Sequence, residues 1–152
     1  MTLKKAVLLY YSIHHDNTQK IAEAIADKLP VDLVRIPAHA PVHLEDYDLV
    51  GFASGIYMSE FGKPLQRLAM ELDGLNGTPC FTLYTCGAPR GEYAGPFASL
   101  LQSRGANIVG GWHCRGFDTF GPFKLIGGLA KGRPNADDLA DAVAFVEALL
   151  AD

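Results

Sequence analysis

Short, continuous apolar runs alternate along this chain with segments whose apolar residues recur every three or four positions. The continuous runs are typical of strands buried on both faces, and the wider spacing is typical of helices that bury one stripe. Strands are predicted over residues 6–11, 31–36, 49–53 and 80–84, and a fifth strand begins at 108–112. The run at 31–36 is more polar than the others, which places it nearer an edge of the sheet.

Four helices are predicted between and after these strands. Their apolar stripes are Ile21, Ile25 and Leu29; Leu65, Leu68 and Leu72; Phe97, Leu100 and Leu101; and Leu139, Val143, Val146 and Leu150. The last helix has the clearest start, because Asn135 is a good N-cap and Asp137 and Asp138 lie in the first turn, where the helix dipole favours anions. This alternation predicts an α/β fold: a three-layer, open, five-stranded parallel sheet with helices on both faces. Ligands of such sheets bind at the carboxyl ends of the strands.

The composition predicts one globular domain over residues 1–152. Hydrophobic residues make up 49% of the chain and charged residues 20%, which excludes a disordered protein. The net charge of −4 gives no general attraction for nucleic acid or for an anionic membrane.

No apolar run approaches the roughly 20 residues that span a bilayer, and we expect no signal peptide because a small-residue cleavage site is lacking. Cys80, Cys86 and Cys114 form no CxxC pair, which favours a reducing, cytoplasmic location.

Polar residues follow the first strand, from Ser12 to Thr18. Hydroxyls, an amide and the N-terminus of a helix come together there, and backbone N–H groups at such a turn bind anions. The alternative is an ordinary helix cap, in which Asn17 or Thr18 serves only the helix.

Two more loops follow predicted strands at the same edge. Ser54-Gly55-Ile56-Tyr57-Met58 places large apolar side chains after a strand end, which favours a planar ligand, unless these side chains pack beneath the next helix. Thr85-Cys86-Gly87-Ala88 and the residues up to Tyr93 include small residues that let the backbone approach a ligand closely. Cys86 is either a nucleophile or, because the sequence shows no fixed partner for it, a buried and inert thiol.

The segment 116–134 is long for a connection, and such segments are usually functional or disordered. Its aromatic residues argue against disorder. From Arg115 to Arg133 the sequence holds four basic residues (Arg115, Lys124, Lys131 and Arg133) and one acidic residue (Asp118), which indicates a docking patch or a lid; the alternative is a solvated loop held by its aromatics. No dinucleotide fingerprint, Walker loop or zinc-protease motif occurs, and Pro41 between His39 and His43 disfavours a metal pair on a helix.

Taken together, these loops resemble the flavodoxin family over nearly the whole chain. Ser12 and Asn17-Thr18 match the ends of that family's phosphate loop, while residues 14–16 depart from its middle. The chain looks most like a short-chain subgroup with a Ser-x-His-His-Gly-Asn-Thr loop, a Gly-Ile-Tyr turn (Gly55-Ile56-Tyr57) and a tail from Gly116 to Asn135. In that subgroup a glycine stands where this chain has Asp16.

The resemblance implies the strand order 2-1-3-4-5 and the cofactor FMN. The phosphate would lie on the Ser12–Thr18 loop, and the isoalloxazine ring between 54–58 and 85–93, with Tyr57 as the first candidate to stack on it and Tyr93 as the second. Backbone groups near Gly55 and Gly87 would bond the ring edge. The implied FMN-binding residues are Ser12, His14, His15, Asp16, Asn17, Thr18, Ser54, Gly55, Ile56, Tyr57, Met58, Thr85, Cys86, Gly87, Ala88 and Tyr93.

Asp16 conflicts with a phosphate site. A carboxylate about 5 Å from one phosphate charge costs roughly 3 kcal/mol at an effective dielectric near 20. Either its side chain turns to solvent, or His14 or His15 offsets its charge, or the site is weak. We expect the first, with the backbone turn preserved because Asp tolerates the left-handed conformation.

The resemblance implies an FMN-binding flavoprotein that passes electrons between redox partners. One alternative is an FMN-dependent NAD(P)H oxidoreductase acting on a quinone or similar small acceptor, with the 116–134 segment holding a substrate or a cofactor phosphate. Another is a binding module without redox activity that has lost the flavin site through Asp16.

Overall fold

Strands and helices alternate along the chain as the apolar pattern predicts. The computed structural model describes residues 4–13, 15–88, 91–119 and 125–151. The elements are β1 (Ala6–Tyr11), α1 (Asn17–Lys28), β2 (Val31–Arg35), β3 (Leu49–Tyr57), β4 (Glu60–Phe61), α2 (Lys63–Glu71), β5 (Pro79–Cys86), α3 (Gly95–Ser103), β6 (Asn107–Arg115) and α4 (Ala136–Ala151).

The central sheet has the order β2-β1-β3-β5-β6, and every neighbouring pair in this row is parallel. The predicted five-stranded parallel sheet, with its order 2-1-3-4-5 counted over the parallel strands, is therefore confirmed. The structure adds β4, a two-residue strand that pairs antiparallel with the end of β3.

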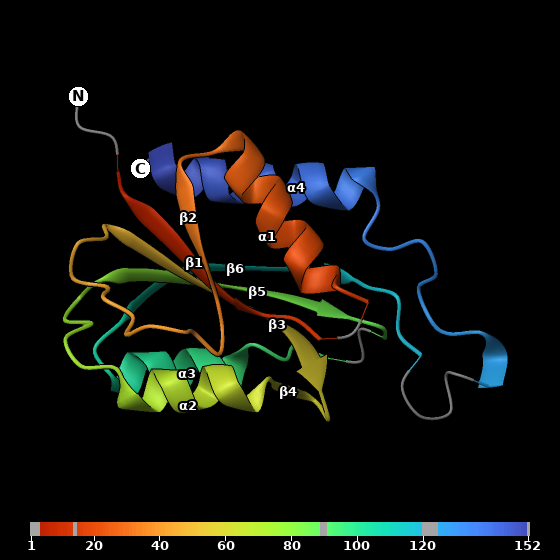
Figure 1. Ribbon diagram of the computed structural model, residues 1–152, viewed down its shortest axis with the longest axis horizontal. Helices are drawn as coiled ribbons and strands as arrows, with labels where there is room; N and C mark the ends of the chain where they lie inside the picture. Colours follow the sequence, from red (N-terminus) through yellow and green to blue (C-terminus); the bar gives the residue numbers. More distant parts are fainter. Residues whose placement is uncertain (1–3, 14, 89–90, 120–124, 152) are drawn as a thin grey trace.

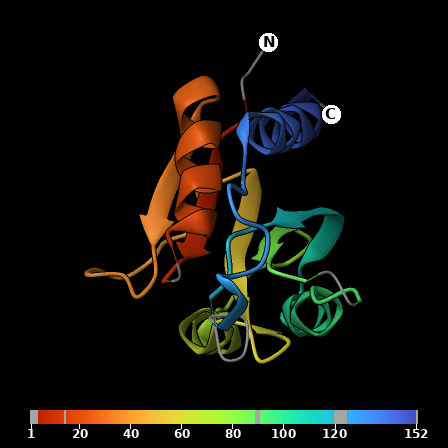
Figure 2. The ribbon, with the colours of Figure 1, turned by 90° about the vertical axis from the view of Figure 1, so that its right-hand side faces the viewer.

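Three layers enclose this sheet (Figures 1 and 2). Helices α1 and α4 cover one face, and α2 and α3 cover the other. Along β1, Leu8 packs into the cluster beneath α1 and α4, while Val7 and Leu9 pack into the cluster beneath α2 and α3. Both faces of the central strands are thus buried, and this is why their sequences are continuously apolar.

The strands run further toward the carboxyl edge than the sequence predicts. β3 continues past residue 53 to Tyr57, and β5 continues past residue 84 to Cys86. Ser54 therefore lies in a strand, paired with both neighbours, and not in a loop. Its buried hydroxyl is satisfied, since Oγ donates to the Gly55 carbonyl and accepts the Gly62 N–H. A polar residue is tolerated at this buried position because both bonds are made locally.

The start of α4 confirms the predicted N-cap. The Asn135 Oδ1 accepts the Asp138 N–H at 3.0 Å, and the Asp138 Oδ2 accepts the Asn135 N–H at 2.7 Å. Such reciprocal bonding satisfies two donors at the end of the helix. Over the described ranges, no helix is both long and apolar enough to cross a membrane.

Candidate functional site

A cleft of about 260 Å³ opens at the carboxyl ends of the parallel strands. This is the edge that Figure 2 faces. The β1–α1 connection, the β3–β4 hairpin, the end of β5 and the segment after β6 all contribute. The lining residues are Ser12, Asn17, Thr18, Gly55, Ile56, Tyr57, Met58, Ser59, Thr85, Cys86, Gly87, Ala88, Tyr93, Gly116, Phe117 and Asp118.

The β1–α1 connection presents buried polar groups to this cleft. Ser12 and Thr18 are both 2% exposed. The Gln19 N–H donates to the Ser12 Oγ, and the Thr18 hydroxyl lies 3.1 Å from that of Thr85. Asp16, the N-cap residue of α1, makes no capping bond with its own side chain, whereas the Ser12 Oγ accepts the N–H of Gln19 in the first turn. The side chains of Asn17 and Thr18 bond outside α1, to the Phe117 carbonyl and to the Thr85 hydroxyl, so neither serves as the helix cap.

Asn17 carries a buried acceptor that has no hydrogen-bond partner in the described structure. Its Nδ2 donates to the Phe117 carbonyl at 2.9 Å, which fixes the orientation of the amide. The opposite atom, Oδ1, is buried and unsatisfied. Leaving such an acceptor without a donor costs about 1–3 kcal/mol. The cleft therefore suits a ligand that brings a hydroxyl or an N–H to this atom while an anionic end meets the N-terminus of α1.

Three predicted site residues do not line the cleft, although they adjoin it. Ser54 is completely buried within β3. His15 and Asp16 are exposed, and both have left-handed backbone conformations, with φ of 52° and 55°. The expectation that Asp16 turns to solvent and keeps the turn agrees with this geometry. His14 lies outside the described residues.

The β3–β4 hairpin forms one wall of the cleft. Ile56 is half-buried against the core, as expected if this segment packs beneath the next helix. Met58 is 80% exposed, as expected if the segment leaves apolar surface for a ligand. The ring of Tyr57 meets Tyr11 edge-on, with 5.6 Å between centroids, and its hydroxyl accepts the Ile13 N–H at 3.3 Å. Burial raises the pKa of Tyr57 to about 12, so the phenol is neutral at physiological pH.

The opposite wall is the end of β5 and the residues after it. Burial raises the pKa of the Cys86 thiol above its ordinary value, which favours the inert thiol over the nucleophile. The Tyr93 hydroxyl donates to the Ala88 carbonyl at 3.3 Å. Gly87 has no room for a side chain, because a Cβ would lie 2.5 Å from the Cβ of Asp118.

Four residues of the cleft lining are not among those predicted from the sequence: Ser59, Gly116, Phe117 and Asp118. Ser59 lies in the turn after β3, one residue beyond the predicted stretch. The other three directly follow β6 at the same carboxyl edge, and the rule used for the other loops applies to them equally. Gly116 packs so tightly on Asn17 that a Cβ would lie 2.6 Å from its Nδ2.

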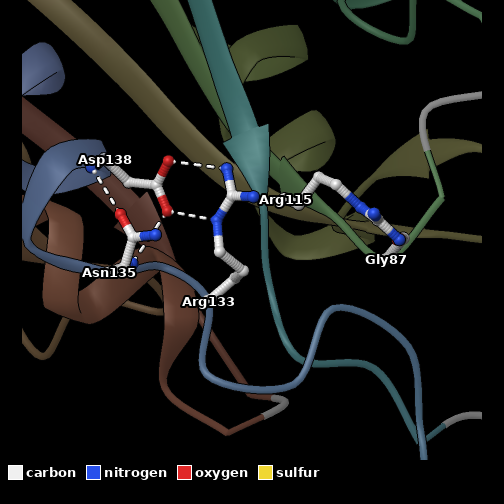
Figure 3. Close-up of polar contacts among 5 residues, drawn as sticks. All are labelled: Gly87, Arg115, Arg133, Asn135 and Asp138. Atoms are coloured by element: carbon white, nitrogen blue, oxygen red, sulfur yellow. Dashed lines mark hydrogen bonds and ion pairs between the residues drawn. The ribbon is translucent and has the colours of Figure 1, made fainter.

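Two of the four basic residues between Arg115 and Arg133 are used in contacts within the fold. Figure 3 shows that Arg133 forms a forked pair with Asp138, in which Nη2 donates to Oδ1 at 2.7 Å. Arg115 donates from Nε and Nη2 to the Gly87 carbonyl at 3.1 and 2.8 Å. Lys131 is exposed, and Lys124 lies outside the described residues. The predicted docking patch thus loses two of its four cationic side chains to the fold.

A family profile described as "Flavodoxin domain" matches residues 8–102 of this sequence. The chain belongs to the flavodoxin-domain family. An uncharacterized protein of Methanocaldococcus jannaschii is 42% identical over 150 residues, which span 96% of this chain and 98% of that protein.

Solved flavodoxins share the fold of this flavodoxin domain. Oxidised flavodoxin 2 from Bacillus cereus is similar with a TM-score of 0.66 at 21% identity, over 96% of this chain and 97% of its own. A flavoprotein from Lactobacillus acidophilus NCFM, solved in complex with FMN, has a TM-score of 0.57 at 18% identity, over 72% of this chain and 93% of its own. The family match ends within α3, so β6 and the segment that follows it lie beyond the matched part.

Proposed function

We propose that this flavodoxin domain binds FMN in the cleft at the carboxyl edge of its sheet and carries electrons between redox partners. One observation carries the proposal: a single cleft joins the N-terminus of α1 to two walls that bear aromatic side chains. FMN has the matching chemistry, since it combines an anionic phosphate, a chain of hydroxyls and a flat ring. Family membership and the fold of the solved flavoproteins support the same assignment.

The polar end of the cleft suits the phosphate and the hydroxyl chain. The first amides of α1 and the hydroxyls of Ser12 and Thr18 donate hydrogen bonds to an anion, and the helix dipole adds to this attraction. A phosphate has no hydrogen to give the buried Asn17 Oδ1, whereas a sugar-alcohol hydroxyl has one. His15 and Asp16 would then shape the loop from outside the cleft.

The apolar end suits the ring. Tyr57 and Tyr93 remain our candidates for stacking on it, and the backbone at Gly55 and Gly87 for bonding its edge. When bound, FMN supplies the electron-transfer chemistry, and the protein positions it and sets its potential. The walls that Ile56 and Met58 provide exclude water from part of the ring.

The oxidoreductase alternative loses part of its support, because Arg115 and Arg133 bond within the fold, although Lys131 remains exposed. We also propose a cytoplasmic location, which agrees with three free cysteines, all of them buried. Residues 1–152 act as one domain in this proposal, since helices from both halves of the chain cover the same sheet.

A fluorescence titration of the purified protein with FMN and with riboflavin tests the cofactor. We expect FMN to bind at least tenfold more tightly than riboflavin, because only FMN brings a phosphate to the N-terminus of α1. Equal affinities would contradict the phosphate site. Protein that stays colourless with excess FMN would overturn the proposal and favour the binding module without redox activity.

Anaerobic reduction of the FMN-loaded protein with dithionite, followed by mixing with cytochrome c, tests electron transfer. We expect rapid oxidation of the flavin and stoichiometric reduction of the cytochrome. The same protein with NADH or NADPH and a soluble quinone tests the enzyme alternative. Fast nicotinamide oxidation without a protein partner would favour the oxidoreductase.

A further inference from the structure

Arg115 reaches from the last position of β6 to the wall of the cleft. Its Nε and Nη2 both donate to the carbonyl of Gly87, which lines the cleft, while Arg115 itself does not (Figure 3). The parallel pairing of β5 with β6 ends at Cys86 and Arg115, where the Gly116 N–H still donates to the Cys86 carbonyl. The guanidinium therefore extends the bonding between these two strands by one residue, into the wall.

This contact fixes the direction of a peptide group. The carbonyl and the N–H of a trans peptide point in opposite directions, so holding the Gly87 carbonyl also fixes where the Ala88 N–H points. The carbonyl is directed at Arg115, which does not line the cleft, so the Ala88 N–H points away from Arg115. A cationic donor also polarises the peptide, which strengthens its N–H as a donor.

Opposite charges lie on the two sides of Gly87. The Arg115 guanidinium bonds its carbonyl, and the Asp118 carboxylate lies so close that a Cβ on Gly87 would be 2.5 Å from Oδ2. Burial is the main cause of the raised pKa of the neighbouring Cys86 thiol, while the charge of Arg115 lowers that pKa and the charge of Asp118 raises it. The two charges therefore act in opposite directions on a residue of the cleft lining.

We propose that Arg115 is a positioning residue for the flavin: it holds the Gly87–Ala88 peptide against the ring edge, and its charge favours the reduced cofactor. This inference rests on the proposed function. Full reduction adds two electrons from the reductant to the ring, with protons taken from solvent, and any net charge that the ring keeps is negative. A nearby cation stabilises that charge, and the carboxylate of Asp118 opposes it.

Three substitutions separate charge from geometry. Arg115→Gln removes the charge and the fork, Arg115→Lys keeps the charge and loses the fork, and Arg67→Gln makes the same charge change at an exposed position of α2. Each variant is loaded with FMN. The two-electron midpoint potential is measured against a reference dye, affinity for oxidised FMN by fluorescence, and folding by circular dichroism.

We expect Arg115→Gln to weaken binding of reduced FMN about tenfold more than binding of oxidised FMN. For a two-electron couple this difference lowers the midpoint potential by about 30 mV. Arg115→Lys should keep most of the potential while binding both forms less tightly, and Arg67→Gln should match the wild type. Asp118→Asn should shift the potential in the opposite direction, upward.

The outcomes distinguish this proposal from the one it rests on. Wild-type protein that binds no FMN overturns both. If the wild type binds FMN and Arg115→Gln weakens both redox forms equally, Arg115 is only structural and this proposal alone fails. If Arg115→Gln does not fold, the midpoint potentials of Arg115→Lys and Asp118→Asn test the proposal instead. The proposal fails if the potential is unchanged in Asp118→Asn and lowered in Arg115→Lys.

Discussion

The ring of His15 stacks on the ring of Phe117, with 4.4 Å between centroids and 26° between planes. The His15 Nε2 also lies 2.9 Å from the Thr119 Oγ1. These contacts join the β1–α1 connection to the segment after β6, although neither His15 nor Thr119 lines the cleft. Phe117 and Thr119, about 100 residues later in the sequence, thus support the loop that we assign to the phosphate.

His15→Ala should weaken FMN binding without changing the lining of the cleft. Aromatic pairs are worth about 0.5–1.5 kcal/mol, so we expect the Kd to rise about two- to tenfold. His15→Phe keeps the stacking but strains the left-handed backbone at this position, so it should restore only part of the affinity, and Thr119→Val removes only the hydrogen bond. Fluorescence titration measures all three, and wild-type affinity in His15→Ala would contradict the support that we infer.

Asp16→Asn and Asp16→Gly should both tighten FMN binding. The carboxylate is exposed, so solvent screening reduces its repulsion of the phosphate below the sequence-based estimate. We expect a gain of about three- to tenfold at low salt, and both replacements tolerate the left-handed backbone at this position. The gain should shrink toward zero in 1 M salt, where the Debye length is about 3 Å. A gain that salt leaves unchanged would show that charge is not its cause.

The positions of the strands are predictable, whereas their ends are not. Buried strands are apolar on both faces, as in Ala6–Tyr11, and this signal needs no knowledge of the tertiary structure. Ser54 and Thr85 are polar, and in the sequence they resemble loop residues. Both are buried in strands because Gly62 bonds the Ser54 hydroxyl and Thr18 lies within hydrogen-bond distance of Thr85. Gly62 and Thr18 both lie outside the strand concerned, so a pattern within that strand does not show that these polar positions can be buried.

The site, like the strands, is predictable in its location but not in its detailed contacts. Placing ligand-binding loops at the carboxyl ends of parallel strands predicts most of the cleft lining. The rule also covers Phe117, which follows β6, but the bond from Asn17 to the Phe117 carbonyl is a contact that no local pattern encodes. Similarly, the sequence shows that Arg115 and Arg133 are basic, but it does not show that each has a partner within the fold.

Asp138→Asn should destabilise the protein at neutral pH and much less in acid. The hydrogen-bonded Arg133 guanidinium holds the pKa of Asp138 below its ordinary value of 3.8. A lowered folded-state pKa gives stability that is complete above the unfolded pKa and is lost as the pH falls through the folded value. We expect a loss of about 1–3 kcal/mol at pH 7, narrowing below about pH 4.

Asp137→Asn is the matched control, since it removes a neighbouring carboxylate from the same helix turn at an exposed position. Urea unfolding of both variants across pH 3–7 measures the difference. If the two variants lose equal stability at pH 7, the helix dipole explains the effect and the Arg133 pair does not.

The three thiols should be unreactive in the folded protein. Cys80, Cys86 and Cys114 are 0%, 6% and 7% exposed. Burial raises the pKa of Cys80 and of Cys114 to about 12, so almost none of their thiolate is present at pH 8. Burial also raises the pKa of Cys86 above its ordinary value, which lowers its thiolate fraction. We therefore expect no reaction with dithionitrobenzoate within minutes, and three equivalents after unfolding in guanidinium chloride. Fast labelling of one thiol that disappears in Cys86→Ser would instead mark Cys86 as an accessible nucleophile in the cleft and revive a catalytic role for it.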